Sequence, residues 1–165
     1  AAACAVGVLM QLSEEQIKTR MADFNGVKRR FDYRIEREDL VYIDDYAHHP
    51  EEIRAIITAV KRLYADKELM VIFQPHLYTR TRDFGPQFAE VLGLADRVVM
   101  LDIYPARELP IPGITAQWLL DMIPGDNKVL VPKDSVLEYL QTHRPQVLLT
   151  VGAGDSLVPV LTGGL

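Results

Sequence analysis

Apolar and polar residues follow a helical spacing in the first part of the chain. Residues 1–12 are rich in helix-forming apolar residues, which predicts one helix. Ser13 and Gln16 have the spacing of a capping box that starts a second helix, and Asn25 followed by Gly26 predicts its end. We therefore expect two helices before the main body of the chain.

The next two segments have the period of β-strands. Residues 28–37 alternate apolar and polar side chains, and residues 40–44 form a second short strand pattern. The polar pair Glu38 and Asp39 between them is typical of a turn. This pattern predicts a β-hairpin at the entry to the main domain.

Helical stripes alternate with unbroken apolar runs over the remainder of the chain. Pro50, Glu51 and Glu52 favour the first turn of a helix, and residues 69–73 form an apolar run typical of a strand buried on both faces. Further helices are predicted at residues 83–94, 115–123 and 134–142, and further strands at residues 97–101, 128–131 and 147–151. This alternation predicts an α/β fold with a doubly wound, mostly parallel sheet that has helices on both faces.

The longest irregular stretches follow two of these strands directly, at residues 74–82 and 102–115. In a doubly wound sheet the carboxyl ends of the strands face the ligand crevice, so we expect both loops to carry function. The sequence has no internal repeat and no Gly/Ser-rich linker. The one plausible boundary lies near residue 26, which divides the chain into residues 1–26 and a main domain at 27–165.

Composition limits the kinds of function. The chain has 165 residues, of which 48% are hydrophobic and 25% charged, as in an ordinary globular domain. A net charge of -5 without a basic run argues against nucleic acid as a partner. The single cysteine, Cys4, cannot form an internal disulfide, which fits a reducing compartment. The N-terminal apolar run is too short to span a bilayer and lacks a basic flank, so we expect neither a signal peptide nor membrane insertion.

Chemically active side chains are concentrated in residues 44–50, which read Asp-Asp-Tyr-Ala-His-His-Pro. In the simplest interpretation, Asp44 or His49 caps the following helix and the other residues form a solvated loop. In a second interpretation, an Asp accepts hydrogen bonds from hydroxyl groups while a His contacts a substrate or relays protons. In a third, both Asp and both His residues of the segment bind metal ions, but few further ligands follow in the sequence.

Arginines in two segments are also weighed as candidates. Arg80, in the loop that also carries His76, follows a buried strand, and its planar guanidinium suits a carboxylate or phosphate. Arg82 is interpreted as a surface salt bridge. Arg29 and Arg30 lie where the helical preface meets the first strand, at a hinge position from which one of them could reach a phosphate held by a preceding domain.

A glycine-containing turn, Gly-Ala-Gly-Asp at residues 152–155, follows the last buried strand and is expected to open a short helix. Its amides could bind an anion, or its small residues could let the backbone approach a ligand closely. The turn lacks the third glycine and the following βαβ unit of a dinucleotide site, which argues against a nicotinamide or flavin cofactor.

Taken in order, several segments resemble the C-terminal part of the Mur ligases. The two specific ones are Asp-Asp-Tyr-Ala-His-His-Pro and Phe-Gln-Pro-His-x-Tyr-x-Arg-Thr. The resemblance covers nearly the whole chain, through residues 26–31, 44–50, 73–81, 103–108 and 152–155.

The resemblance implies a three-domain enzyme with a UDP-sugar domain, a central ATPase and a Rossmann-like, amino-acid-binding C-terminal domain. Residues 27–165 would be that third domain, and residues 1–26 the last helices of the central domain or a linker. The P-loop pattern Gly-x-x-x-x-Gly-Lys-Ser/Thr is absent from this sequence. ATP and Mg²⁺ are therefore expected to be held mainly by the central domain, and this fragment alone is expected to be inactive.

Within the family, Tyr46 and the loop at residues 74–80 favour the members that add L-alanine. The implied reaction phosphorylates the lactyl carboxylate of UDP-N-acetylmuramate with ATP. The amine of L-alanine then attacks the acyl phosphate and forms an amide. The resemblance implies that this step of peptidoglycan precursor synthesis takes place in the bacterial cytoplasm.

The resemblance also implies roles for individual residues. Arg30 would contact the terminal phosphate and Asp45 the nucleotide, and we expect Arg30 and His48 to take part in catalysis. Leu77 stands where many relatives have a second arginine, which leaves recognition of the substrate carboxylate to Arg80. Four residues would surround the incoming L-alanine: Tyr46, His48, His76 and Arg80.

Two alternatives stay open from the sequence. A murein-peptide-recycling ligase would share the Asp-Asp-x-Ala-His-His-Pro element, but it usually has phenylalanine in place of Tyr46 and a different arginine loop. A free-standing nucleotide- or sugar-binding module without catalysis would belong to a different class. A P-loop upstream of this segment would distinguish the ligase from the module.

Overall fold

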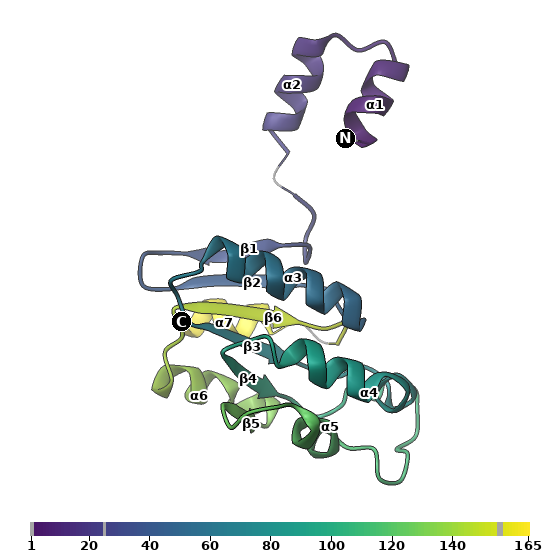
Figure 1. Cartoon of the computed structure of the whole chain (residues 1–165). Helices are drawn as coiled ribbons and strands as arrows, with labels where there is room; N and C mark the ends of the chain where they lie inside the picture. Colours follow the sequence, from purple (N-terminus) through teal and green to yellow (C-terminus); the bar gives the residue numbers. More distant parts are fainter. Residues whose placement is uncertain (1, 25, 155–156) are drawn as a thin grey trace.

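A computed structural model describes residues 2–24, 26–154 and 157–165 of the chain. Within these residues, one six-stranded sheet has the order β1-β2-β6-β3-β4-β5 (Figure 1). Strand β1 pairs antiparallel with β2, and all other neighbours pair in parallel. The strands are β1 (Asp32–Glu36), β2 (Val41–Asp45), β3 (Leu69–Phe73), β4 (Arg97–Met100), β5 (Lys128–Leu130) and β6 (Val147–Val151). The predicted doubly wound, mostly parallel sheet is confirmed.

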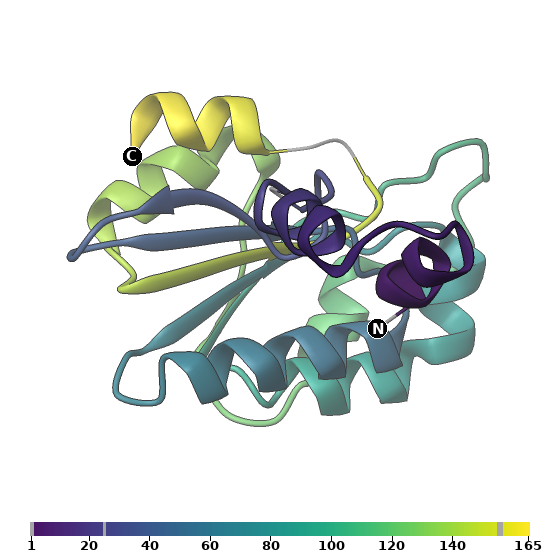
Figure 2. The same ribbon diagram turned by 90° about the horizontal axis from the view of Figure 1, so that it is seen from above.

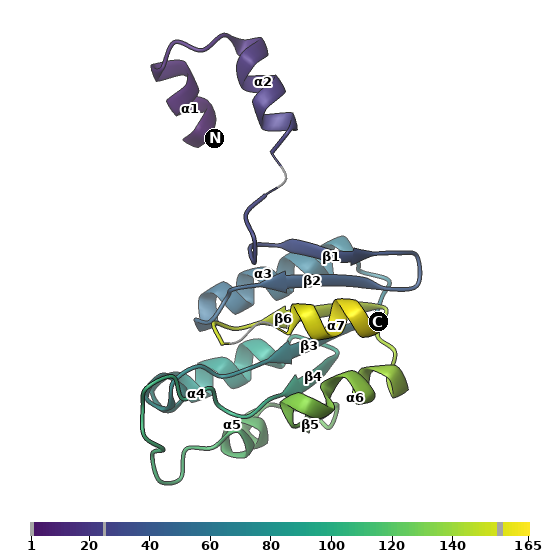
Figure 3. The ribbon, with the colours of Figure 1, turned by 180° about the vertical axis from the view of Figure 1, so that it is seen from behind.

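Helices cover both faces of the sheet, as predicted. Figure 2 shows α3 and α4 below the sheet and α7 above it, and Figure 3, from behind, shows α6 and α7 in front of the strands. Helix α5 packs with α4 on the first face. The helices of the main body are α3 (Pro50–Leu63), α4 (Tyr78–Leu92), α5 (Ala116–Met122), α6 (Val136–Thr142), preceded by the short 3₁₀ helix η1 (Lys133–Ser135), and α7 (Val158–Gly164).

The core has two apolar layers, one on each face of the sheet, because successive side chains of a strand point to opposite faces. Ile43 and Val71 pack in the layer under α3, α4 and α5. Tyr42 and Ile72, their chain neighbours, pack in the layer under α6 and α7. All four side chains are buried, which explains why the strands read as unbroken apolar runs.

The two N-terminal helices, α1 (Ala2–Leu9) and α2 (Glu14–Ala22), lie apart from the sheet in Figures 1 and 3. The capping box is confirmed, since Ser13 Oγ accepts from the Gln16 N–H at 3.2 Å and Gln16 Oε1 accepts from the Ser13 N–H at 2.9 Å. Helix α2 ends at Ala22, earlier than predicted. Asn25, half of the predicted stop signal, lies outside the described residues. None of the described helices is both long and apolar enough to cross a bilayer.

Two predicted boundaries are wrong in ways that matter for the site. The first strand begins at Asp32 rather than at residue 28, because Arg29 and Phe31 adopt positive φ angles of 57° and 48° and form a turn. Helix α4 begins at Tyr78 rather than at residue 83, so Arg80 lies in its first turn and not in an irregular loop.

Candidate functional site

The carboxyl ends of β2, β3, β4 and β6 lie at the same edge of the sheet, because these four strands are parallel. Each strand ends in or is followed there by a candidate segment of the sequence: residues 44–48, 74–80, 102–108 and 152–154. This is the edge at which doubly wound sheets bind ligands. The fold thus brings together segments that are far apart in the chain.

Arg29 ties the entry of the domain to this edge. Its Nε contacts Asp44 Oδ2 at 3.2 Å, and its Nη2 and Nη1 donate to the carbonyls of Gly152 and Gly154 at 2.6 and 3.3 Å. Asp44 is buried and also accepts from the Thr150 hydroxyl at 2.6 Å. The carbonyls of Gly152 and Gly154 therefore bind an arginine of the same chain, while Asp155 lies outside the described residues.

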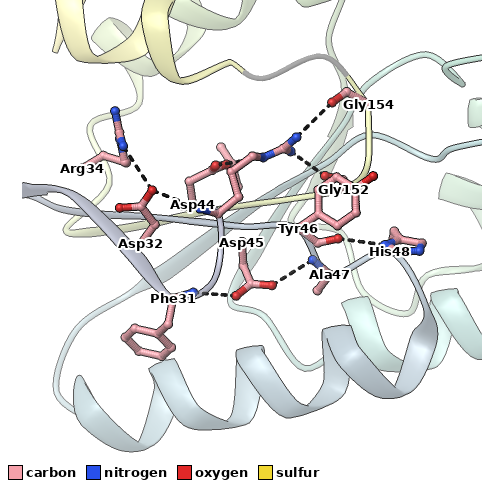
Figure 4. Close-up of polar contacts among 12 residues, drawn as sticks. Phe31, Asp32, Arg34, Asp44, Asp45, Tyr46, Ala47, His48, Gly152 and Gly154 are labelled. Carbon is pink, nitrogen blue, oxygen red and sulfur yellow. Dashed lines mark hydrogen bonds and ion pairs between the residues drawn. The ribbon is translucent and has the colours of Figure 1, made fainter. Parts of the chain in front are cut away.

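Asp45 is buried, and backbone groups hold both of its carboxylate oxygens (Figure 4). Oδ2 accepts from the Phe31 N–H at 2.7 Å and Oδ1 from the Ala47 N–H at 2.8 Å. These bonds fix the turn before β1 against the loop after β2. A carboxylate has about four acceptor sites, so two remain for a ligand.

Arg30 is exposed, and its guanidinium lies 5.8 Å from the centre of the Tyr46 ring. The guanidinium of Arg29 lies 4.9 Å from the same ring, so Tyr46 contacts two cations. Within the described part of the chain, no hydrogen bond or ion pair engages the Arg30 side chain. Its five N–H donors are available to an anion at the site edge.

His48 has one ring nitrogen fixed by its surroundings (Figure 4). Its Nδ1 lies 2.8 Å from the Tyr46 carbonyl oxygen and 3.6 Å from Glu52 Oε2. Because a carbonyl only accepts, Nδ1 carries a proton, and in the neutral ring Nε2 is then an acceptor. Glu52 also accepts from the backbone N–H groups of His48 and His49 at 3.0 and 3.3 Å, and these bonds lower its pKa.

His76 and Arg80 carry two buried polar atoms without a partner among the described residues, His76 Nδ1 and Arg80 Nη1. Burial lowers the pKa of His76, and the positive charges of Arg80 and His48 lower it further. Leaving a buried donor unpaired is costly, so these atoms are suited to a ligand that accepts from Arg80.

The geometry gives the metal interpretation no support. No group of three or more His, Cys, Asp and Glu side chains in the described ranges has the arrangement of a metal site. Asp44 and Asp45 are engaged as described above, and the His49 ring packs edge-on against Phe84 with centroids 4.7 Å apart. Arg82 forms an exposed ion pair with Asp83 at 2.7 Å, which confirms the predicted surface salt bridge.

Three contributors to the site were not predicted. The resemblance assigned Arg30 to a phosphate, but the contacts of Arg29 with Asp44 and the carbonyls after β6 were not predicted, because nothing in the pair Arg-Arg indicates which side chain turns inward. Glu52 could have been found, since it stands at the third helical position after His49 and completes a capping box there. Glu108 binds Thr79 across 29 residues of sequence, and no local pattern signals that contact.

Together the fold and the site define a doubly wound α/β domain that places arginine, histidine and carboxylate side chains at the carboxyl ends of its parallel strands. The chain belongs to the Mur ligase family: the family described as "Mur ligase, glutamate ligase domain" matches residues 29–154.

Among curated proteins, the chain is similar to two enzymes named UDP-N-acetylmuramate–L-alanine ligase. The one from Phocaeicola vulgatus is 48% identical over 165 aligned residues, which cover 98% of this chain and 36% of that protein. The one from Flavobacterium johnsoniae is 50% identical over 141 residues, covering 86% and 31%. The chain thus spans about a third of the length of these relatives.

Among solved structures, the UDP-N-acetylmuramate–alanine ligase of Thermotoga maritima matches with a TM-score of 0.75 and 26% identity. The match covers 96% of this chain and 34% of that one. The fold similarity therefore includes nearly all of the chain.

Proposed function

We propose that this chain is the C-terminal, amino-acid-binding part of an ATP-dependent ligase that joins L-alanine to UDP-N-acetylmuramate in the bacterial cytoplasm. Residues 27–165 would be the binding domain, and residues 1–26 the last helices of the central ATPase domain or a linker. The identity of 48–50% to relatives that carry this name supports the proposal. The reaction would proceed through an acyl phosphate and serve peptidoglycan precursor synthesis.

The observation that carries the proposal is the pair of buried, unpartnered atoms Arg80 Nη1 and His76 Nδ1. A free amino acid presents a carboxylate, and a guanidinium binds a carboxylate with charge-assisted hydrogen bonds. Arg80 would hold the carboxylate of L-alanine. Because Leu77 brings no second arginine to this position, Arg80 would do so without a second guanidinium from the residue after His76.

The attacking amine must lose a proton, and His48 would accept it. Its Nδ1–H is held by the Tyr46 carbonyl, which leaves Nε2 free to accept when the ring is neutral. Tyr46 would line the same pocket with its ring.

Two residues of this chain, Arg30 and Asp45, would contact the nucleotide. Arg30, exposed and without a hydrogen-bonded partner among the described side chains, fits the terminal phosphate of ATP. Asp45 would use its two remaining acceptor sites toward the nucleotide. Mg²⁺, held mainly by the central domain, would neutralise charge on the phosphates.

Substitution of Arg80 tests the proposal in the complete ligase. We expect Arg80→Ala to raise the KM for L-alanine roughly ten- to hundredfold, because a charge-assisted hydrogen bond contributes about 1.5–3 kcal/mol. The KM for ATP should hardly change. Arg82→Ala is the matched control, since Arg82 is two residues away and only pairs with Asp83 on the surface. A large rise in the ATP KM with an unchanged alanine KM would reverse the assignment of this segment.

A further inference from the structure

Helix α4, which carries Arg80, has an unusual N-terminus. Leu77 at the N-cap position adopts φ 71° and ψ 133°, and its side chain offers no hydrogen bond to the first turn. Residues with a Cβ rarely adopt positive φ, and N-caps are usually Ser, Thr, Asp or Asn. The residue that precedes the helix therefore leaves its first N–H groups without a side-chain acceptor.

Glu108 supplies this acceptor from another loop. Its Oε2 accepts from the Thr79 N–H at 3.0 Å, and its Oε1 accepts from the Thr79 hydroxyl at 2.5 Å. The bonds from the Thr79 hydroxyl and backbone lower the pKa of Glu108. A carboxylate at this position also complements the positive end of the helix dipole.

The loop that carries Glu108 is joined to the His76 segment as well. The Tyr104 N–H donates to the Pro75 carbonyl at 2.8 Å, and the Tyr104 carbonyl accepts from the Leu77 N–H at 2.9 Å. The rings of Tyr104 and His76 are stacked, with centroids 5.6 Å apart and planes inclined by 15°. Residues 104–108 thus hold both the turn before α4 and its first residues.

We propose that Glu108 is a positioning residue for the amino-acid site: by fixing the first turn of α4, it sets where Arg80 and His76 point. Arg80 follows Thr79 directly, so a shift of this turn moves the guanidinium with it. Glu108 acts through Thr79 and does not itself touch the substrate. The inference rests on the proposed role of Arg80 and His76 in binding L-alanine.

The first experiment follows the titration of His76 by NMR in the 165-residue chain. Glu108→Gln keeps the size of the side chain and one acceptor oxygen but removes the charge. We expect the pKa of His76 to fall in this variant, since the charge of Glu108 raises it against burial, Arg80 and His48. Glu90→Gln is the matched control, because it removes a carboxylate from the far end of α4, where Glu90 pairs with Arg54 at 2.8 Å. An unchanged His76 pKa in Glu108→Gln would show that the Glu108 carboxylate does not lie close to His76, which the positioning role requires.

The second experiment measures steady-state kinetics in the complete ligase. Glu108→Ala should raise the KM for L-alanine about five- to tenfold, with kcat changed less than about twofold and the ATP KM unaffected. Thr79→Val, which deletes one of the two bonds, should show part of this effect, and Thr79→Ser should restore wild-type values. Glu90→Gln should leave the alanine KM unchanged. A cap that served stability alone would lower the melting temperature without this change in KM.

The outcomes separate this inference from the proposed function. If Arg80→Ala raises the alanine KM while Glu108→Ala and Glu108→Gln fold normally and leave it unchanged, the positioning role is wrong and the proposed function stands. If neither Arg80 nor Glu108 affects the alanine KM, the assignment of the whole segment to the amino acid is wrong. If Glu108→Ala does not fold, Glu108→Gln and Thr79→Val decide the question.

Discussion

At the scale of single residues, Arg29 and Arg30 show how neighbours of the same type acquire different roles. Arg29 has a positive φ of 57°, which turns its side chain toward Asp44 and the carbonyls of Gly152 and Gly154. Arg30 returns to the surface, where its guanidinium contacts the ring of Tyr46. The first arginine holds the domain together, and the second is available to a ligand.

Stability measurements should separate the two arginines. Arg29→Ala leaves Asp44, whose side chain is only 3% exposed, without its cation, and should lower the free energy of unfolding by about 2 kcal/mol. Solvent screens the ion pair in part, because the Arg29 side chain is itself 27% exposed, and this keeps the loss moderate. Arg30→Ala, the control at the next position, should change stability by less than about 0.5 kcal/mol. Urea unfolding of both variants checks this, and equal losses would refute the separation of roles.

His76 should make stability depend on pH. Burial, first, and then the charges of Arg80 and His48 lower its pKa in the folded chain. Below about pH 6.5, the ordinary histidine pKa, the unfolded chain therefore takes up this proton before the folded one does. The free energy of unfolding should fall as pH drops from about 6.5 until the folded pKa is passed. His76→Asn should flatten this part of the profile in urea titrations at pH 7.5, 6.5 and 5.5, and an identical slope in both proteins would count against it.

At the scale of elements, the sequence pattern predicted the bounds of strands that depend on their own residues, but not the start of a helix that depends on a distant loop. The strands at 69–73 and 147–151 were predicted with their observed bounds, because continuous burial leaves a continuous apolar run. The start of α4 was predicted five residues late, because its capping group, Glu108, comes from a distant loop. The sequence therefore identified Arg80 as a candidate but not the helix that presents it.

Gly152 directly follows β6, and we expect a side chain at this position to destabilise the fold. Its φ is 142°, and a Cβ added there would lie 3.0 Å from the carbonyl oxygen of Gln74 on the adjacent strand end. Gly152→Ala should therefore cost about 2–3 kcal/mol through strain and the close contact together. Gly113→Ala is the matched control: its φ is also positive, 82°, but nothing lies within 4 Å, so about 1 kcal/mol is expected. Similar losses in thermal or urea unfolding would show that the contact with Gln74 does not matter.

At the scale of the whole molecule, strand order creates the site. Strand β6 is the last in sequence but lies between β2 and β3, so Gly152 comes beside Arg29 across 123 residues. A hydrophobic pattern predicts that a strand exists, but not which neighbours it pairs with, because every buried strand of a parallel sheet carries the same kind of run. The fold class and most candidate residues could thus be predicted, while the contacts that join them could not.

The arrangement of the site predicts that this 165-residue chain folds but does not turn over substrates by itself. Phosphoryl transfer needs groups that gather charge around the transferring phosphate, and the sequence contains no P-loop to supply them. Arg30 and Asp45 would form one wall of the nucleotide site, too few contacts to offset the entropy lost on binding ATP. Incubation of the purified chain with ATP, Mg²⁺, UDP-N-acetylmuramate and L-alanine should release no phosphate, whereas the complete ligase should release it only when all substrates are present.

The turn around Arg29 and Arg30, between the helices α1–α2 and the sheet, is where a closing motion would bring Arg30 onto the phosphate. If phosphate-releasing activity copurified with the isolated chain, the prediction that catalysis needs the other domains would be wrong, and the chain would be active by itself.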